Sequence, residues 1–220
     1  MRGVRAVAGL LGELLVTLGV VLLLFVGWQL WWTDVVSDAD AARVVGTLQT
    51  DFDNPQWVQP KHVKLGDAFA IVRIPRFGEK FARPLYEGTT RDVLARGIGH
   101  YTGTAMPGEI GNFAMAGHRT TYGKPFNRIA ELANGDVVLV ETKDTWYVYR
   151  VSSHEIVPPT QVSVVLPVPN QPGAEPTEKI LTMTSCHPEF SARQRYIVHA
   201  TLEATYPHAD GVPADVLKVS

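Results

Sequence analysis

One uninterrupted apolar run dominates the N-terminal part of the chain. Residues 14–32 (LLVTLGVVLLLFVGWQLWW) carry no charged side chain, and a helix of that length, at about 1.5 Å per residue, spans a hydrocarbon core of about 30 Å. Arg2 and Arg5 precede the run, and three aspartates follow it within residues 34–40. Because basic residues tend to stay in the cytoplasm, the pattern predicts a single-pass cell-membrane anchor at residues 1–33, with the N-terminus cytoplasmic and the rest of the chain extracellular.

A cleaved secretory signal is the alternative, since such signals also combine a basic start with an apolar core. The run is longer than a usual signal core, and no clean cleavage site of small residues follows it directly, although residues 37–42 (SDADAA) imitate one. The sequence therefore favours an uncleaved anchor, and with either reading the body of the protein lies outside the cytoplasm.

The pattern changes after the anchor. Apolar residues recur near helical spacing through residues 36–48, and Pro55 and Pro60 then interrupt the pattern. We expect a short juxtamembrane helix or stalk across residues 34–64 and a globular domain across residues 65–220.

Strand patterns dominate the globular domain. Short apolar runs end at glycines and prolines, which is typical of β-strands joined by turns. Helical patterns are brief, at residues 91–97 and 126–132. Many short strands with few helices favour an all-β closed barrel or a sandwich over a parallel α/β sheet. The expected strands are residues 69–74, 112–117, 136–142, 145–151, 179–185 and 195–205.

One long connection carries six prolines, at residues 157–178. A proline-rich connection of this length in a compact domain is either a mobile excursion or a wall of a binding site.

Charge and cysteine content narrow the function. The formal net charge is −2, so there is no basic excess of the kind that binds nucleic acid, and we expect no nucleic-acid partner. Cys186 is the only cysteine in the chain. An unpaired thiol outside the cytoplasm is unusual, since secreted chains tend to use cysteines in pairs, and this marks Cys186 as a candidate reactive group.

Three kinds of reactive side chain lie at the ends of expected strands. Cys186 and His118 each directly follow a strand, Arg193 stands just before the last one and Arg195 begins it. A thiol needs a basic or positive neighbour to act as a thiolate nucleophile, so these residues together suggest a Cys/His site with a guanidinium for the oxyanion. Taken singly, a buried structural cysteine, a loop histidine and solvated arginines remain open.

A metal site fits poorly. Cys186 and His187 are adjacent, which is a poor spacing for two ligands of one tetrahedral ion, and no second cysteine completes a zinc set. No phosphate-binding glycine pattern or zincin helix motif is present. The sequence predicts neither a metal nor a cofactor.

Two stretches, together with the anchor, resemble a known family. Residues 108–132 (GEIGNFAMAGHRTTYGKPFNRIAEL) and 180–200 (ILTMTSCHPEFSARQRYIVHA) are similar to the sortases, the cysteine transpeptidases of Gram-positive cell surfaces. The family signature T-L-x-T-C stands here as TMTSC, with methionine for leucine and serine for the last threonine. The GHRTTYG and CHP segments look most like the class E sortases of actinobacteria, and the resemblance covers residues 69–206.

The resemblance implies a closed eight-stranded β-barrel with short helices, and roles for three residues. Cys186 would attack the threonine carbonyl of an LPxTG or LAxTG sorting signal and cleave the Thr–Gly bond through a thioacyl intermediate. His118 would protonate the leaving amine and deprotonate the incoming one, and Arg195 would donate to the developing oxyanion. The implied partners are surface proteins with a C-terminal sorting signal and an amine of a peptidoglycan precursor.

Two further assignments follow from the resemblance. Arg193 competes with Arg195, which immediately precedes the apolar YIVHA segment of the last strand as the family's arginine precedes its last strand. Tyr101 matches a tyrosine that class E members carry near the substrate groove, so it is expected to contact substrate; the alternative is a ring packed in the barrel wall. Residues 157–178 fall where sortases place a loop that lines the groove.

Two rival functions are separable. The L,D-transpeptidases also join peptidoglycan through a cysteine, but their S-x-G-C-x-R signature is absent. A catalytically silent, membrane-anchored binding or scaffolding module could use the same barrel. Cys186-dependent cleavage of a sorting peptide distinguishes the enzyme from the module.

Overall fold

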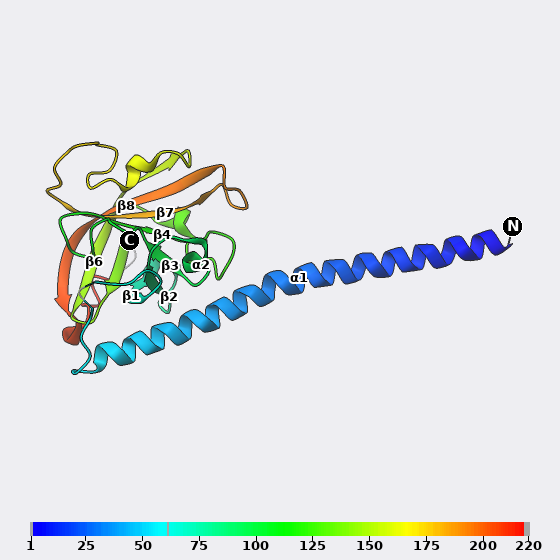
Figure 1. Cartoon of the computed structure of the whole chain (residues 1–220), viewed down its shortest axis with the longest axis horizontal. Helices are drawn as coiled ribbons and strands as arrows, with labels where there is room; N and C mark the ends of the chain where they lie inside the picture. The colour runs from blue at the N-terminus through cyan, green and yellow to red at the C-terminus, as the bar shows by residue number, and fades with distance from the viewer. Residues whose placement is uncertain (1, 61, 218–220) are drawn as a thin grey trace.

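The computed structural model of the chain describes residues 2–60 and 62–217. Within them, eight strands close into a barrel, and one 52-residue helix, α1 (Arg2–Asp53), passes along the barrel and projects far beyond it (Figure 1). The expected all-β closed barrel behind an N-terminal apolar helix is confirmed. Three parts of the expected anchor, stalk and barrel domain lie outside the described residues: Met1, Lys61 and residues 218–220.

The strands follow the order β1-β2-β3-β4-β7-β8-β6-β5 around the barrel. Among the described strands, only the β2–β3 and β4–β7 pairs are parallel. The β4–β7 pair brings the carboxyl ends of two strands to the same end of the barrel, next to the β7–β8 connection. The bounds are β1 (Ala68–Arg73), β2 (Ala82–Glu87), β3 (Ile98–His100), β4 (Gly111–Ala116), β5 (Val137–Glu141), β6 (Thr145–Val157), β7 (Lys179–His187), β8 (Gln194–Pro207) and, for the short helix, α2 (Arg91–Leu94).

The sequence patterns locate six of these strands and miss two. β2 contains Pro84 and two charged residues, and β3 is only three residues long around Gly99, so neither gives an apolar run. The helical patterns shorten as well: α2 ends at Leu94, and residues 126–132 contain only a 3-10 turn at Ile129–Glu131.

Alternation along the strands separates a filled interior from an outer face. In β7, Leu181 and Met183 are fully buried in the barrel core. Because successive side chains of a strand point to opposite faces, the even-numbered residues of β7, including Cys186, stand on the outer face. Other large side chains that fill the interior are Phe69, Phe113, Met115 and Tyr149.

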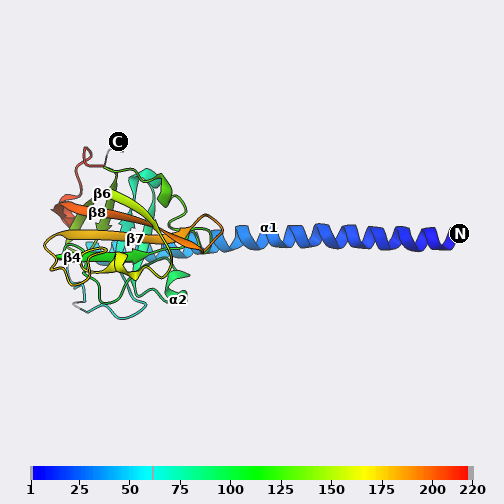
Figure 2. The same ribbon diagram turned by 90° about the horizontal axis from the view of Figure 1, so that it is seen from above.

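The C-terminal half of α1 is fixed against the barrel. Val45, Leu48 and Phe52 recur at helical spacing and are buried against Ile71 of β1. Burial of such side chains stabilises the contact by about 1.5–3 kcal/mol each. The helix continues without a break from the apolar run to this contact, so the juxtamembrane segment lies on the barrel surface (Figure 2).

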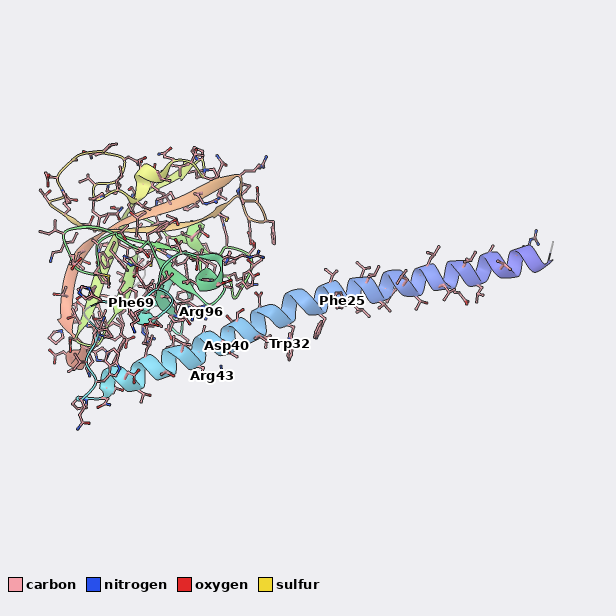
Figure 3. All side chains as sticks on the ribbon, in the orientation of Figure 1. Phe25, Trp32, Asp40, Arg43, Phe69 and Arg96 are labelled. Atoms are coloured by element: carbon pink, nitrogen blue, oxygen red, sulfur yellow. The ribbon has the colours of Figure 1, made fainter. Side chains whose placement is uncertain are left out.

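The N-terminal half of α1 is exposed. Val7–Trp28 is long and apolar enough to cross a membrane, a test that a signal sequence also passes, and none of its most apolar stretch is buried. Near its C-terminal end, the rings of Phe25, Trp28 and Trp32 lie near one another along the helix, with centroid separations of 6.2 and 6.1 Å (Figure 3). Such amphipathic rings are typical of a membrane–water interface.

A cavity of about 580 Å³ lies between α1 and the barrel. Asp40 and Arg43 line it from the helix, and Phe69 and Arg96 line it from the barrel (Figure 3). None of its lining residues is a candidate catalytic residue.

Candidate active site

The structure brings Cys186 and Arg195 together. They are directly opposed in the antiparallel β7–β8 pair, and opposed residues of such a pair point their side chains to the same face. Both side chains are half-buried on the outer face. The thiol of Cys186 is free.

His118 lies at the same level, just past the end of the neighbouring strand β4. In the parallel β4–β7 register, Ala116 is opposite Thr184, and His118 follows Ala116 by two residues as Cys186 follows Thr184. The pairing continues past the strand ends, because the Gly117 N–H donates to the Thr184 carbonyl at 3.1 Å. The Ser185 hydroxyl also donates to the Gly117 carbonyl, at 2.9 Å.

The surroundings of His118 favour the neutral form of its ring, which can accept a proton. Burial, and to a smaller extent the positive charge of Arg91, lower the pKa of His118 below its usual value of 6.5. Its Nε2 is buried and has no hydrogen-bond partner within the described residues. A neutral imidazole with an unpaired nitrogen can accept a proton from a neighbouring acid.

The two candidate arginines differ in position. Arg195 is a residue of β8, and its Nη1 donates to the carbonyls of Ala192 and Gln194 at 3.0 and 2.9 Å. Arg193 is exposed and lies in the turn before the strand. Of the two arginines, only Arg195 is paired across the strands with Cys186, which favours Arg195 over Arg193 for a role at the thiol.

Tyr101 lies over the outer face of β7. Its hydroxyl and the Thr184 hydroxyl share a hydrogen bond of 3.0 Å, and Thr184 is two residues from Cys186 on the same face. The ring is half-buried. Tyr101 therefore borders the same surface as the candidate nucleophile.

Arg119 contacts the backbone of Cys186, a role that the sequence patterns do not predict. The residue is only 8% exposed, and its Nη1 donates to the Cys186 carbonyl at 3.2 Å and to Nδ1 of His187 at 3.0 Å. Its guanidinium carbon lies 5.8 Å from the centre of the Tyr196 ring. Arg119 thus fixes the backbone of Cys186; the only sequence signal for it is an arginine directly after the candidate histidine.

The proline-rich connection between β6 and β7 covers part of the outer face. Val164 is buried there against Val157 and Ile197. The buried amide of Asn112, on β4, donates to the carbonyls of Val164 and Leu166 at 3.1 and 2.9 Å. We refer to residues 158–178 as the groove wall, because these contacts hold the segment beside the strand that carries Cys186.

A chain of hydrogen bonds continues from Asn112 across the outer face of β4 and β7, which we call the floor. The Thr182 hydroxyl donates to the Asn112 side-chain oxygen at 2.7 Å and meets Nδ1 of His199 at 2.8 Å. Nε2 of His199 bonds to Glu155 at 2.9 Å, and Glu155 accepts from Asn170 of the groove wall at 2.8 Å. The groove wall is therefore tied to β4, β7, β8 and β6.

A cavity of about 370 Å³ opens at the same edge of the floor. Asn112 and Ile110 line it from the β3–β4 side, and Val165, Pro167 and Pro176 line it from the groove wall. This hollow offers an apolar surface next to the polar floor, as peptide-binding grooves do.

The closed barrel, with Cys186 opposite Arg195 and with His118 just past the end of the neighbouring strand, has the arrangement expected of a sortase. The family model described as "Sortase domain" matches residues 72–203, and the chain belongs to the sortase family. The resemblance seen in the sequence is thereby confirmed.

Similar sequences and structures carry the names of class E sortases. The chain is 40% identical over 211 residues to sortase SrtE1 of Streptomyces coelicolor, covering 92% of this chain but only 59% of that relative's length. Sortase E from Streptomyces avermitilis has a TM-score of 0.64 at 41% identity, over 70% of this chain and 99% of that one. Sortase E1 from S. coelicolor, solved with a tripeptide in the active site, has a TM-score of 0.62 at 36% identity, over 70% of this chain and 98% of that one.

Proposed function

We propose that this chain is a membrane-anchored cysteine transpeptidase that cleaves the Thr–Gly bond of an LPxTG- or LAxTG-type sorting signal and transfers the protein to a peptidoglycan amine. The observation that carries the proposal is the pairing of Cys186 with Arg195, one strand from His118, in a chain of the sortase family. A peptide substrate is supported by the tripeptide in the active site of the similar sortase E1.

In the first half-reaction, the Cys186 thiol gives its proton to His118, and the sulfur attacks the threonine carbonyl carbon. The resulting tetrahedral intermediate collapses, and the bond from that carbon to the glycine nitrogen breaks. The leaving amine takes the proton from His118. The products are a thioester on Cys186 and a peptide with a free N-terminal glycine.

In the second half-reaction, an acceptor amine attacks the thioester carbonyl and loses a proton to His118. The bond from the carbonyl carbon to sulfur breaks, and Cys186 regains the proton. The lowered pKa of His118 supports this double role, because the ring is neutral and able to accept a proton at each stage.

Arg195 is the proposed electrophilic partner. A guanidinium has five N–H donors, so its contacts with the carbonyls of Ala192 and Gln194 leave others for the oxygen of the tetrahedral intermediate. Donation to an oxyanion in a water-poor site is worth several kcal/mol in the transition state, on the order of 2.7–4 per donor.

The sorting signal is proposed to lie on the outer face of β4 and β7, between Tyr101 and the groove wall. The Tyr101–Thr184 hydrogen bond and the cavity beside Asn112 support this path. The exposed Val7–Trp28 segment supports membrane attachment, with the barrel on the extracellular side.

The test uses the full-length chain in detergent micelles with a quenched LAxTG or LPxTG peptide and an acceptor amine. The parent should release the glycine side, and Cys186→Ala should lower the rate at least about a thousandfold without changing the circular dichroism spectrum. If the parent cleaves neither peptide, the proposal is wrong and a silent binding module explains the fold better.

A further inference from the structure

The loop that carries His118 reaches from the barrel to helix α1. Its base is closed by the Phe126 N–H, which donates to the His118 carbonyl at 3.0 Å. The closure is tight, since a Cβ added at Gly117 would lie 2.7 Å from the Phe126 ring. The tip of the loop consists of Tyr122–Lys124.

The tip has a backbone conformation that residues other than glycine rarely adopt. Tyr122, Gly123 and Lys124 have φ angles of 54°, 68° and 36°. Residues with side chains persist in this left-handed region where surrounding contacts hold them there. The conformation of the tip therefore depends on its neighbours.

Helix α1 supplies those neighbouring contacts. Lys124 Nζ donates to the Asp34 carboxylate at 2.6 Å. Gly123 lies so close to the helix that an added Cβ would be 3.1 Å from the Ser37 Cβ and 3.3 Å from an Asp38 carboxylate oxygen. The segment Asp34–Asp38 thus forms the surface on which the tip rests.

The loop tip also contacts the candidate general acid–base, His118. The Tyr122 ring lies 5.1 Å from the His118 ring, centre to centre. A shift of the tip moves the Tyr122 ring and with it the packing of the imidazole. Proton transfer is sensitive to displacements of this kind, because a catalytic group misplaced by about 1 Å loses much of its rate advantage.

The supporting segment is itself fixed to the barrel on its C-terminal side. Asp38 is held to β2 by Arg83 at 2.6 Å, and Val45 and Phe52 are buried farther along the helix. Asp34 is six residues beyond Trp28, the end of the membrane-crossing segment, or about 9 Å along the helix. Figures 1 and 2 show the β7–β8 connection at the end of the barrel that faces the N-terminal half of α1.

We propose that the Asp34–Asp38 segment of α1 is a positioning element of the active site: by supporting Tyr122–Lys124, it holds the His118 ring in place for proton transfer. The inference rests on the proposed function, because His118 must act in the reaction for its position to affect turnover. The membrane anchor is then a structural part of the active site as well as a tether.

The first test reverses charges in the full-length chain, reconstituted in lipid nanodiscs and assayed with a quenched sorting peptide. Lys124→Asp makes two carboxylates face each other, and Asp34→Lys makes two ammonium groups face each other. Each change should lower kcat roughly fivefold and leave KM unchanged, because the proposed peptide groove is not touched. Aspartate tolerates left-handed backbone, so Lys124→Asp keeps the loop foldable.

Combining Asp34→Lys with Lys124→Asp restores an ion pair of reversed polarity, and kcat should return to within about twofold of the parent. Gln49→Lys places the same new charge at an exposed position of the helix and should leave kcat unchanged. Ser37→Trp wedges bulk under Gly123 and should lower kcat about tenfold or more, whereas Ala42→Trp, at an exposed position of the same helix, should not.

A second measurement keeps the outcomes distinguishable. If the parent is active and the charge variants keep its kcat, the positioning role is wrong and the proposed function stands. If the parent cleaves no peptide, the ring signals of His118 in nuclear magnetic resonance spectra of the same proteins decide. A positioning role predicts that these signals move in Lys124→Asp and return in the combined variant, and unmoved signals contradict it.

Discussion

Asn112 is the central link between the groove wall and the floor of the proposed peptide site. Its buried amide donates to the Val164 and Leu166 carbonyls and accepts from the Thr182 hydroxyl. Asn112→Ala removes all three hydrogen bonds and leaves the Val164 and Leu166 carbonyls without this donor. Two of the three bonds, those to Val164 and Leu166, attach the wall, so at about 1 kcal/mol of net stability for each hydrogen bond the attachment weakens by about 2 kcal/mol.

The weakening should appear first as detachment of the wall. A loss of about 2 kcal/mol multiplies the population of the detached state by roughly 30. Thermolysin cleaves before apolar residues, which the wall offers at Val164–Leu166, and under conditions of fast opening and closing its rate follows that population. Cleavage within residues 158–178 should therefore be roughly thirtyfold faster in Asn112→Ala. Asn134→Ala, at an exposed position, is the control; a rate within threefold of the parent in Asn112→Ala would refute the reasoning.

Three further predictions concern single side chains around the thiol. The lowered pKa of His118 means that the unfolded state takes up a proton there more readily, so stability should fall as the pH drops through about 6.5 and below. His118→Gln should lose less stability over that range, and equal losses in urea unfolding at about pH 8 and pH 5.5 contradict the assignment. Arg119→Met removes the donor to the Cys186 carbonyl and should lower kcat roughly tenfold in the peptide assay; an unchanged kcat argues against a fixed Cys186 backbone. Tyr101→Phe removes the bond to Thr184 and should raise KM about threefold to tenfold if the tyrosine orients substrate, whereas a packing role predicts an unchanged KM.

The strands that carry the candidate site were predictable from local patterns. β4 and β7 are rich in apolar residues and buried along most of their length, and β8 follows a clear turn, so each produces a recognisable run. β2 and β3 give no such run, because their pairing in the barrel, and not their composition, makes them strands. The continuous helix α1 joins two segments whose patterns differ, which is why the sequence suggested an anchor and a separate stalk or short helix.

The chemistry of the site was only partly predictable. Cys186 could be named because it is unique, and His118 and Arg195 because they stand at strand ends. The contacts of Arg119 with Cys186 and of Asn112 with Thr182 join residues 67 and 70 positions apart. No periodicity expresses such contacts, since they arise from strand register and from how the barrel closes.

The most direct test of the central claim is mass spectrometry of the full-length chain after brief mixing with an LAxTG or LPxTG peptide in the absence of an acceptor amine. The proposed mechanism predicts an adduct on Cys186 whose mass equals the peptide up to its threonine carbonyl, sensitive to hydroxylamine and absent from Cys186→Ala. Cleavage of the peptide by Cys186→Ala at the parent's rate, or turnover by the parent with the acyl group on another residue, would contradict the assignment of Cys186 as the nucleophile.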